Sequence, residues 1–390
     1  MTKTLVISSM LPPYHHGGAE KMAMLFIDEL VQRGIDPLVL THKGSRQGNY
    51  RFLPVFFGNV CSPKQIIRQG RLLKLAYHLL DLFNPLLFLE LIYFCIAKKV
   101  KVIYAHNITY FGFNVLMAAK ICNIKLVQIT HDYYYSCVKS SRFKAGQNCS
   151  KTCTGCALLR APVKLFSRSV DGVFVSKALR DNLTSDLKFK TAKVVYNPRQ
   201  EVSSRTSVQM ESNSSFTLGY LGAIAENKGI LQFLQQHFDL LDSIGANVLI
   251  AGSGKGQYFD DFLALVNSNP SLTYVGQTVP EEFFPKIKFL LVPSVWNEPL
   301  ATVILEALAY GIPVLANHTG GSSEMIDQGQ TGFYFDFFDP NSAKDQLKRI
   351  IKVSNSDYED LQKNIKAKAW PSKANWIETI LITQEALSID

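Results

Sequence analysis

Residues 297–316, NEPLATVILEALAYGIPVLA, place a loop, a helix and a buried strand in succession. Glu298 lies in the loop, and the apolar residues from Ala301 onward repeat at helical spacing until Gly311, where a helix would end. Glu306 follows Glu298 by about two helical turns, so both carboxylates could face one ligand. Carboxylates accept hydrogen bonds from sugar hydroxyls. The alternative is that Glu298 caps the helix and Glu306 is an ordinary surface residue.

The same alternation of short apolar runs and amphipathic helices extends in both directions along the chain. Strands are predicted at residues 4–9, 36–41, 101–105, 125–130 and 172–175, and again at 217–221, 246–251, 272–275, 289–292 and 313–316. Helices are predicted at 20–33, 229–241 and 302–310. Strands that alternate with helices indicate parallel sheets covered on both faces. The sequence therefore predicts an α/β fold with two doubly wound, Rossmann-like halves.

A change in amino-acid composition separates the two halves. Residues 201–215 are rich in Ser, Asn, Thr and Glu and poor in apolar residues, which is typical of a linker. We expect one domain at 1–200, a second at 216–369 and a C-terminal helix at 370–390. In such folds ligands bind at the carboxyl ends of strands, and the natural place for a site is a cleft between the halves.

The composition is that of a globular protein, with 47% hydrophobic and 19% charged residues among 390. The first ten residues lack the apolar run of a secretory signal. The most apolar stretch, residues 72–97, is interrupted by Lys74, His78, Asp81, Pro85 and Glu90. Seven cysteines, an odd number, do not indicate a disulfide framework. These features predict a soluble or peripheral cytoplasmic protein.

Charge divides unevenly along the chain. Residues 1–200 carry 28 Lys and Arg against 10 Asp and Glu, a net +18, whereas residues 201–390 carry 13 against 22, a net −9. A basic half is typical of proteins that meet nucleic acid, anionic lipid or a phosphorylated substrate, and solubility alone is the alternative. Residues 68–99, with basic ends around apolar helices, favour an anionic membrane surface.

Several short motifs around the first stretch resemble the retaining GT-B glycosyltransferases of family 4, whose signature is Glu-x7-Glu in this setting. The matching residues are Pro293-Ser294, Asn297-Glu298-Pro299, Leu305-Glu306-Ala307, residues 311–314, Gly320-Gly321 with Glu324, and residues 329–332. The resemblance covers essentially the whole chain and is densest over residues 217–335. It implies a GT-B fold, in which the C-terminal helix returns to the N-terminal domain.

The resemblance also implies roles in binding a nucleotide-sugar donor. Glu298 is expected at the hydroxyls of the donor sugar and Glu306 at the ribose, with backbone amides near the sugar and phosphates. The donor-binding residues expected in this way are Gly17, Gly18, Gly222, Lys228, Gly252, Gly276, Glu298, Pro299, Leu300, Ala301, Thr302, Val303 and Glu306. The family often has Phe-Gly at Leu300-Ala301, which bears on the identity of the donor.

One position departs from the family pattern. Family members usually have an Arg five residues before the Lys of this loop, and here Ala223 takes the place of that Arg while Lys228 is present. Lys228 and two helix N-termini are expected to stabilise the leaving diphosphate. Because the candidate site lacks an Asp-x-Asp motif, we expect transfer without a divalent metal. An inactive homologue is the alternative that Ala223 suggests.

Further candidates lie in the first half. His131 ends a predicted strand, and the resemblance implies that it reaches the reaction centre beside Lys228 and Glu298 as a catalytic residue. Acceptor contacts are expected from His15, His16, His106 and Asn107. Each of these histidines could instead be structural.

Four cysteines follow His131 with the spacing Cys-x11-Cys-x3-Cys-x2-Cys. A structural zinc ion bound by them is predicted, with free thiols in a loop as the alternative. These cysteines are Cys137, Cys149, Cys153 and Cys156.

Taken together, these features predict a glycosyltransferase that moves a sugar from a nucleotide-sugar donor to a glycan or lipid-linked saccharide. The resemblance implies retention at the anomeric carbon and a place in bacterial surface polysaccharide synthesis, such as lipopolysaccharide, O-antigen or capsule. The expected partners are the donor, the acceptor and an anionic membrane at the inner face, and nucleic acid is not among them. A non-catalytic sugar-nucleotide-binding scaffold, and an epimerase or hydrolase of similar fold, are the alternatives.

Overall fold

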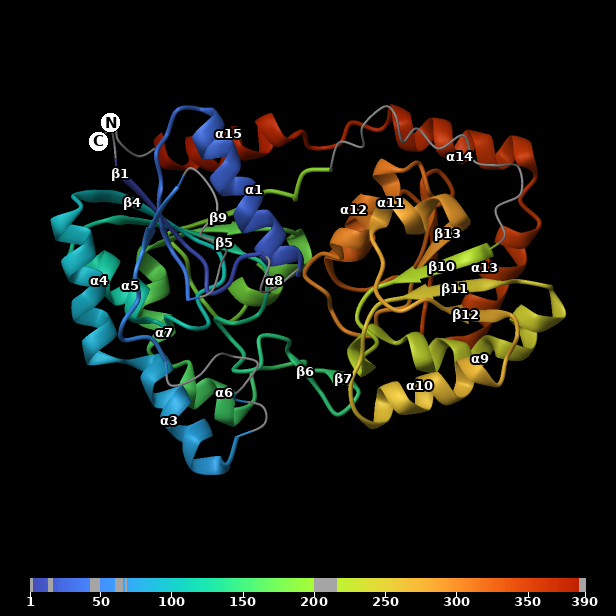
Figure 1. Cartoon of the computed structure of the whole chain (residues 1–390), viewed down its shortest axis with the longest axis horizontal. Helices are drawn as coiled ribbons and strands as arrows, with labels where there is room; N and C mark the ends of the chain where they lie inside the picture. Colours follow the sequence, from blue (N-terminus) through green and yellow to red (C-terminus); the bar gives the residue numbers. More distant parts are fainter. Residues whose placement is uncertain are drawn as a thin grey trace. The chain divides into compact units, whose positions relative to one another are not determined.

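The computed structural model describes residues 3–12, 17–42, 50–59, 66, 69–199 and 216–385. Within it the chain forms two compact units, each built around a parallel sheet (Figure 1). The first unit contains residues 1–142, 150–197 and 373–390, and the second contains residues 143–149 and 198–372. The predicted linker at 201–215 lies outside the described residues.

The first unit has a seven-stranded sheet in the order β3-β2-β1-β4-β5-β8-β9. Buried aliphatic runs such as Leu5–Ile7 explain its central strands, because both faces of the sheet are covered by helices. Its strands are β1 Lys3–Ile7, β2 Leu38–Leu40, β3 Arg51–Leu53, β4 Val100–Ala105, β5 Lys125–Thr130, β8 Val170–Phe174 and β9 Thr191–Val194. Its helices of four or more residues are α1 Gly18–Gln32, α3 Arg71–Leu82, α4 Pro85–Ala97, α5 Asn114–Ile121, α6 Thr154–Leu159, α7 Val163–Phe166, α8 Lys177–Thr184 and α15 Lys373–Glu385.

The C-terminal helix α15 belongs to this first unit. Trp376, Ile377 and Ile380 are fully buried in its core, and the Trp376 ring meets the ring of Phe26 on α1 edge-on at 5.9 Å between centroids. Helices α1 and α15 lie together at the top of the unit in Figure 1. The chain thus returns to complete the unit in which it began.

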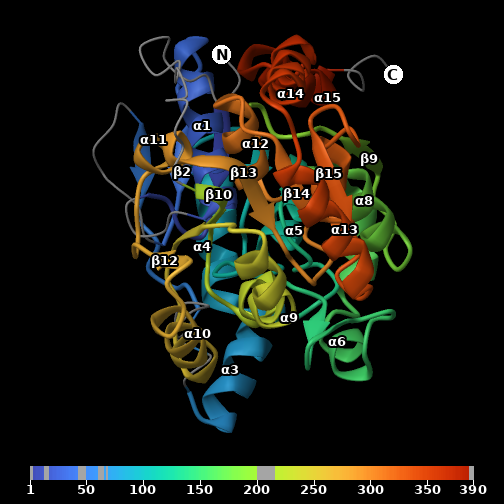
Figure 2. The ribbon, with the colours of Figure 1, turned by 90° about the vertical axis from the view of Figure 1, so that its right-hand side faces the viewer.

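The second unit has a six-stranded parallel sheet in the order β12-β11-β10-β13-β14-β15. Its strands are β10 Phe216–Leu221, β11 Val248–Ala251, β12 Leu272–Tyr274, β13 Ile287–Val292, β14 Val314–Asn317 and β15 Gly332–Phe335. Its helices of four or more residues are α9 Ile230–Ser243, α10 Gln257–Asn267, α11 Pro280–Phe283, α12 Thr302–Ala309, the 3-10 helix Gly320–Met325, α13 Pro340–Ile351 and α14 Asn355–Ala367. Helices α11 and α12 cover one face and α9 and α10 the other (Figure 1), while α13 packs beside the edge strand β15 (Figure 2).

The predicted α/β class and doubly wound halves are confirmed. The sequence analysis missed the short edge strands β3, β9 and β15, which contain three to four residues each and so carry little periodicity. It also missed a small antiparallel hairpin formed by β6 Phe143–Lys144 and β7 Gln147–Asn148. This hairpin belongs to the second unit although it precedes the last strands of the first in sequence.

Candidate active site

Glu298 is held in the loop that follows β13 in the second unit. One carboxylate oxygen, Oε1, forms an ion pair with the Nζ of Lys228, and the other, Oε2, accepts a hydrogen bond from Ser294 Oγ at 2.8 Å. The Glu298 side chain is 8% exposed and that of Lys228 25% exposed. Lys228 also lies over the ring of Trp296, 5.7 Å from its centroid. The two charges that the sequence analysis singled out therefore meet in one half-buried site.

A second loop supports Glu298 from behind. Gly320 has φ +58°, and a Cβ at this position would lie 2.3 Å from the Glu298 carbonyl oxygen. The next residue, Gly321, donates its N–H to that same oxygen at 2.8 Å. The side-chain amide of Asn317 donates to the Ser294 carbonyl at 2.8 Å. Glycine is required at position 320 because the two backbones touch there.

Glu306 lies inside α12, which begins immediately after this loop. It is buried, as are Leu300 and Ala301, which lead into the helix. The Ala301 N–H donates to Ser322 Oγ at 3.2 Å, while Ala301 has no polar side chain to cap the first turn. The start of α12 thus offers backbone N–H groups and the positive end of the helix dipole to an anion.

Glycines let three further backbone segments approach each other closely. Gly252, which follows β11, has φ +144°, and a Cβ there would lie 1.7 Å from the Gly222 carbonyl oxygen. A Cβ on Gly229, at φ +73°, would lie 2.2 Å from the Pro293 carbonyl oxygen. The loop that carries Lys228 is therefore packed directly on the loop that carries Glu298. Gly276 has φ +71° and open space around it. Ala223 is exposed, and its carbonyl accepts from the hydroxyl of Tyr220 at 2.7 Å.

In the first unit, His131 and His106 follow adjacent strands, β5 and β4. Nε2 of His131 and Nδ1 of His106 are 3.0 Å apart, and the rings are stacked with an interplanar angle of 14°. Burial lowers the pKa of His131 to about 4 and lowers the pKa of His106 well below its ordinary value. Both rings are therefore neutral at pH 7, and one ring nitrogen donates a hydrogen bond to the other.

The residues around this pair are polar and closely packed. Gln128 donates to the His106 carbonyl at 2.6 Å, and burial raises the pKa of Asp132 to about 7. Asn107 lies 3.4 Å from Glu20, which is buried in the first turn of α1. Gly17 forms the N-cap of that helix, and Gly18 is its first residue. His15 and His16 lie outside the described residues.

The cysteines after His131 form a smaller group than predicted. Cys156 is hydrogen-bonded to Cys137 and Cys153, and this contact from Cys156, together with backbone N–H groups of the same loop, lowers the pKa of Cys137 to about 5. Cys149 belongs to the second unit. Among the described residues, no group of three or more His, Cys, Asp or Glu is arranged to hold a metal ion. The four-cysteine zinc site stays a prediction to which this geometry gives no support.

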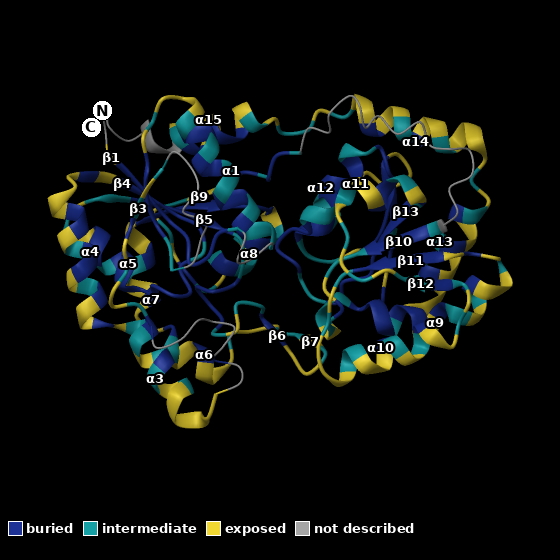
Figure 3. Ribbon diagram, in the orientation of Figure 1, coloured by how far each residue is buried: buried dark blue, intermediate teal, exposed yellow. Residues whose placement is uncertain are grey.

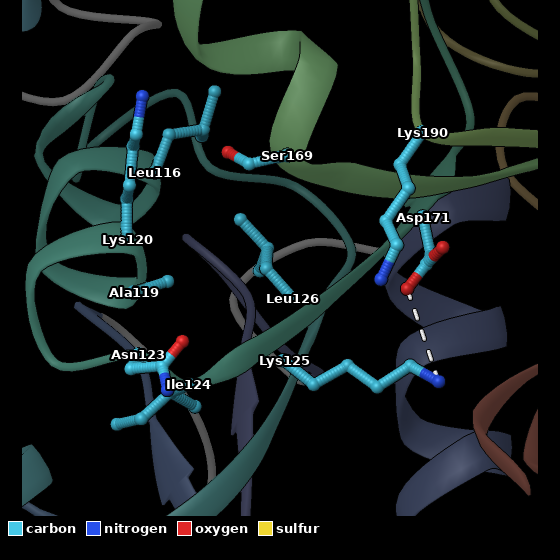
Figure 4. A pocket seen from close by; sticks show the side chains of 10 residues that line it. All are labelled: Leu116, Ala119, Lys120, Asn123, Ile124, Lys125, Leu126, Ser169, Asp171 and Lys190. Carbon is cyan, nitrogen blue, oxygen red and sulfur yellow. Dashed lines mark ion pairs between the residues drawn. The ribbon is translucent and has the colours of Figure 1, made fainter. Parts of the chain in front are cut away.

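A separate cavity of about 370 Å³ lies at the amino-terminal ends of strands β5 and β8 in the first unit (Figure 4). Lys125 and Lys190 flank Asp171 in it, and the Lys125 ammonium lies 3.9 Å from the Asp171 carboxylate. None of the residues predicted for the donor or acceptor lines this cavity. It is therefore distinct from the sites at the carboxyl ends of the strands.

Sequence reasoning overlooked two partners of the Glu298 loop. Ser294 appeared as part of a motif without a role, and its hydroxyl proves to hold a carboxylate oxygen of Glu298. Asn148 attracted no attention, yet its side chain bonds the Val295 carbonyl and the Asn297 N–H. The motif around Ser294 could have suggested the first contact, whereas no local pattern links residue 148 to residue 297.

Two family models match successive parts of the chain. The model described as "Glycosyltransferase Family 4" matches residues 16–199, and the model described as "Glycosyl transferases group 1" matches residues 207–369. Together they leave short segments at the two ends and between them.

Individual relatives and solved structures agree with these matches. A 42.6 kDa protein of the cps region of Klebsiella pneumoniae is 21% identical over 82% of this chain and 86% of its own. The capsular polysaccharide biosynthesis glycosyltransferase CapM of Staphylococcus aureus is 28% identical over 36% of this chain and 37% of its own. The structure of Anabaena HepE in complex with UDP is 16% identical, with a TM-score of 0.73 over 99% of this chain and 100% of that one. WaaG, a glycosyltransferase of lipopolysaccharide biosynthesis, is 14% identical with a TM-score of 0.67 over 97% and 99%.

Proposed function

We infer that this chain, which belongs to the family 4 (group 1) glycosyltransferases and has their GT-B fold, uses a nucleotide sugar as donor. The observation that carries the proposal is the Lys228–Glu298 pair at the carboxyl ends of β10 and β13 in the second unit. The complexes of Anabaena HepE with UDP and with UDP-glucose support a donor of this class.

The proposed roles of the pair follow from its charges. Glu298 accepts hydrogen bonds from the donor sugar, and Ser294 keeps its carboxylate oriented. Lys228 stabilises the charge that develops on the leaving diphosphate, and the N-terminus of α12 adds its dipole. Glu306 binds the ribose of the nucleotide. Since Lys228 and α12 supply positive charge, we propose that no divalent metal is needed, and activity that survives EDTA treatment would support this.

We propose that transfer retains the anomeric configuration. The bond between C1 of the sugar and the phosphate oxygen breaks, and the acceptor hydroxyl oxygen bonds to C1 on the same face. The hydroxyl proton passes to the departing phosphate oxygen, so no protein nucleophile is required. Glu298 is unsuited to be that nucleophile because Lys228 and Ser294 already engage both of its oxygens. An NMR assignment of the linkage in the product tests this stereochemistry.

The acceptor is proposed to be a glycan or lipid-linked saccharide of a bacterial surface polysaccharide. The names of the capsular and lipopolysaccharide relatives support this class. In the first unit, His131 is proposed at the reaction centre, with His106 and Asn107 toward the acceptor. Neutral histidines suit an uncharged hydroxyl, because they can donate or accept a hydrogen bond without drawing the acceptor into an ion pair.

A panel of UDP-, GDP- and other nucleotide sugars, incubated with and without saccharide acceptors, tests the donor proposal. Release of nucleoside diphosphate that depends on acceptor supports transfer. Release without acceptor would indicate a hydrolase, and an altered sugar on an intact nucleotide would indicate an epimerase. Binding without any reaction would indicate a scaffold and would contradict the proposal.

Helices α3 and α4 support a further proposal, contact with an anionic membrane at the inner face of the cytoplasmic membrane. Their outward residues define an apolar face, which is largely exposed (Figure 3). The residues of this face are Leu72, Leu75, Leu79, Leu86, Leu89, Tyr93 and Ile96. In each helix they recur every three or four positions and thus form an apolar stripe along that helix. Arg71 at the start of α3, Lys74 within it, and Lys98 and Lys99 after α4 add positive charge near these stripes.

The opposite side of α3 fixes it to the first unit. Asp81 is buried and forms an ion pair with Arg160 at 2.6 Å, while the hydroxyl of Tyr134 donates to the same carboxylate. Residues 71–97 are long and apolar enough to cross a membrane by length and composition alone. The chain is broken at Phe83 and Asn84, however, and α3 is about 18 Å long, shorter than the roughly 30 Å of a bilayer core. Surface attachment therefore suits these helices better than insertion across a bilayer.

Flotation with vesicles of phosphatidylglycerol and phosphatidylcholine tests the membrane proposal. The native chain should float with anionic vesicles at moderate salt. Replacing Leu72, Leu75 and Leu79 together by Ser should keep the chain in the soluble fraction. Phe338→Ser, at an exposed position of the second unit, is the matched control and should float normally. A native chain that stays soluble with anionic vesicles would end the proposal.

A further inference from the structure

The small hairpin β6–β7 joins the second unit through one of its faces. A two-residue turn at Ala145 and Gly146, both with positive φ, connects its strands as in a type I′ hairpin. Phe143 and Asn148 are cross-strand partners, and Phe143 is buried in the hydrophobic core of the second unit. Lys144 and Gln147 form the other pair and are exposed. The hairpin thus has an inward face made of one apolar and one amide side chain.

Asn148 bonds the backbone of the Glu298 loop on both sides of Trp296. Its Nδ2 donates to the Val295 carbonyl at 2.9 Å, and its Oδ1 accepts from the Asn297 N–H at 2.7 Å. A single amide side chain therefore fixes the residues before and after Trp296. Glu298 is the next residue after Asn297.

The same contacts extend to the loop that carries Lys228. Val295 donates its N–H to the Asn227 carbonyl at 3.1 Å, so its two backbone groups bond Asn227 and Asn148. A Cβ on Gly146 would lie 3.3 Å from Glu226 Oε1, which places the hairpin turn against this loop as well. Through these contacts the hairpin meets the loops of both charged residues.

We propose that Asn148 is a positioning residue for the donor sugar, acting through the backbone of residues 295–297 to hold Glu298 in place beside Lys228. The inference rests on the proposed donor role of Glu298. Hydrogen bonds from a rigid supporting residue hold a charged side chain in its productive geometry. Loss of the two hydrogen bonds of Asn148 would allow residues 295–298 to shift. This shift would weaken contacts with the sugar more than contacts with the nucleotide.

Asn148→Ala removes both hydrogen bonds and is the first test variant. With the active nucleotide sugar from the donor panel, we expect kcat/KM to fall about tenfold, in line with the loss of two hydrogen bonds. Affinity for the free nucleoside diphosphate of that donor should change less than twofold, because the Asn148 side chain bonds residues 295 and 297 and neither Lys228 nor α12, the groups proposed to bind the nucleotide. Asn148→Asp has the same shape but sets an oxygen against the Val295 carbonyl, so we expect a loss at least as large without a cavity.

Gln147→Ala is the matched control, because Gln147 is the neighbouring residue on the exposed face of the same hairpin. It should leave kcat/KM and nucleotide affinity unchanged. Native kinetics in both Asn148 variants would overturn the inference. The inference would also be overturned if donor affinity and nucleotide affinity fell by the same factor and the melting temperature fell as well. That result would give Asn148 a merely structural role. Failure of the donor proposal is seen separately, as native activity in Glu298→Gln.

Discussion

The two units share a fold but differ in what they place at the carboxyl ends of their strands. In the second unit, loops packed through glycines hold an opposite charge pair, Lys228 and Glu298. In the first unit, the corresponding end carries a stacked pair of neutral histidines, His131 and His106. A charged pair suits a sugar diphosphate, and a neutral pair suits an uncharged hydroxyl. This difference is the structural basis for our proposal that the second unit binds the donor and the first unit binds the acceptor.

Net charge does not follow this division. The first half of the chain is basic, at +18, yet its strand ends carry neutral side chains. The second half is acidic, at −9, yet it contributes the lysine of the site. The charge of a half therefore reports on its whole surface, such as the basic ends of α3 and α4, and not on its binding site.

Glu298→Gln should give the largest effect, and it tests whether the charge pair of the second unit is needed for transfer. The change keeps the shape of the side chain but removes the charge that meets Lys228. We expect transfer to fall about 1,000-fold, the upper range for loss of one preorganised polar group, while the protein stays folded. Acceptor-dependent release of nucleoside diphosphate measures the loss. Glu282→Gln, at an exposed position of the same unit, is the control, and a fully active Glu298→Gln would falsify the donor-site assignment.

Trp376→Ala should destabilise the first unit while sparing nucleotide binding by the second. Trp376 is 1% exposed, and its removal opens a cavity beside Phe26. We expect a loss of about 3 kcal/mol in the free energy of unfolding, measured by chemical denaturation. Ile382→Ala, at an exposed position of the same helix, should cost little. If Trp376→Ala abolished nucleotide binding in the folded protein, the division between the units would be wrong.

The sequence predicted the repeated α/β pattern well, because buried parallel strands such as Val248–Ala251 are continuous apolar runs. It also singled out Glu298 and Lys228, each a few residues after a predicted strand, and their roles in donor binding stay predictions. The family resemblance placed both residues at one site, but the sequence could not predict their direct ion pair, since they are 70 positions apart. It also could not place Asn148 at the Val295 carbonyl, because that contact depends on a hairpin that leaves one unit for the other. The neutrality of His131 arises from burial, which no local pattern reports.

Gly320→Ala tests whether close backbone packing is needed to hold Glu298 in place beside Lys228. The positive φ costs an L residue roughly 1 kcal/mol, and the new Cβ would also press on the Glu298 carbonyl oxygen. We expect a loss of about 2 kcal/mol in stability together with about tenfold lower kcat/KM. Gly245→Ala has the same strain, at φ +63°, but open space around it, so it should lose stability without losing activity. Equal activities in the two variants would show that the contact at Gly320 is not needed.

The pH dependence of stability tests the neutral side of the comparison. The pKa of His131 is about 4 in the folded protein, below the 6.5 or so of an unfolded chain. Between these values the unfolded state binds more protons, so the contribution of His131 is complete above pH 6.5 and is lost as the pH falls toward 4. Asp132, whose pKa burial raises to about 7, has the opposite slope. The difference between the native chain and His131→Asn isolates the histidine.

Because His131 is only half-buried, we expect the stability advantage of the native chain over His131→Asn to be smaller at pH 5 than at pH 7.5 by about 1 kcal/mol. Denaturant titrations at the two pH values measure it, and His318→Asn, in the second unit, provides the comparison. An advantage that grew as the pH fell would mean that His131 is protonated in the folded state. The two units would then both present charge at their strand ends, and the contrast between a charged donor side and a neutral acceptor side would not hold.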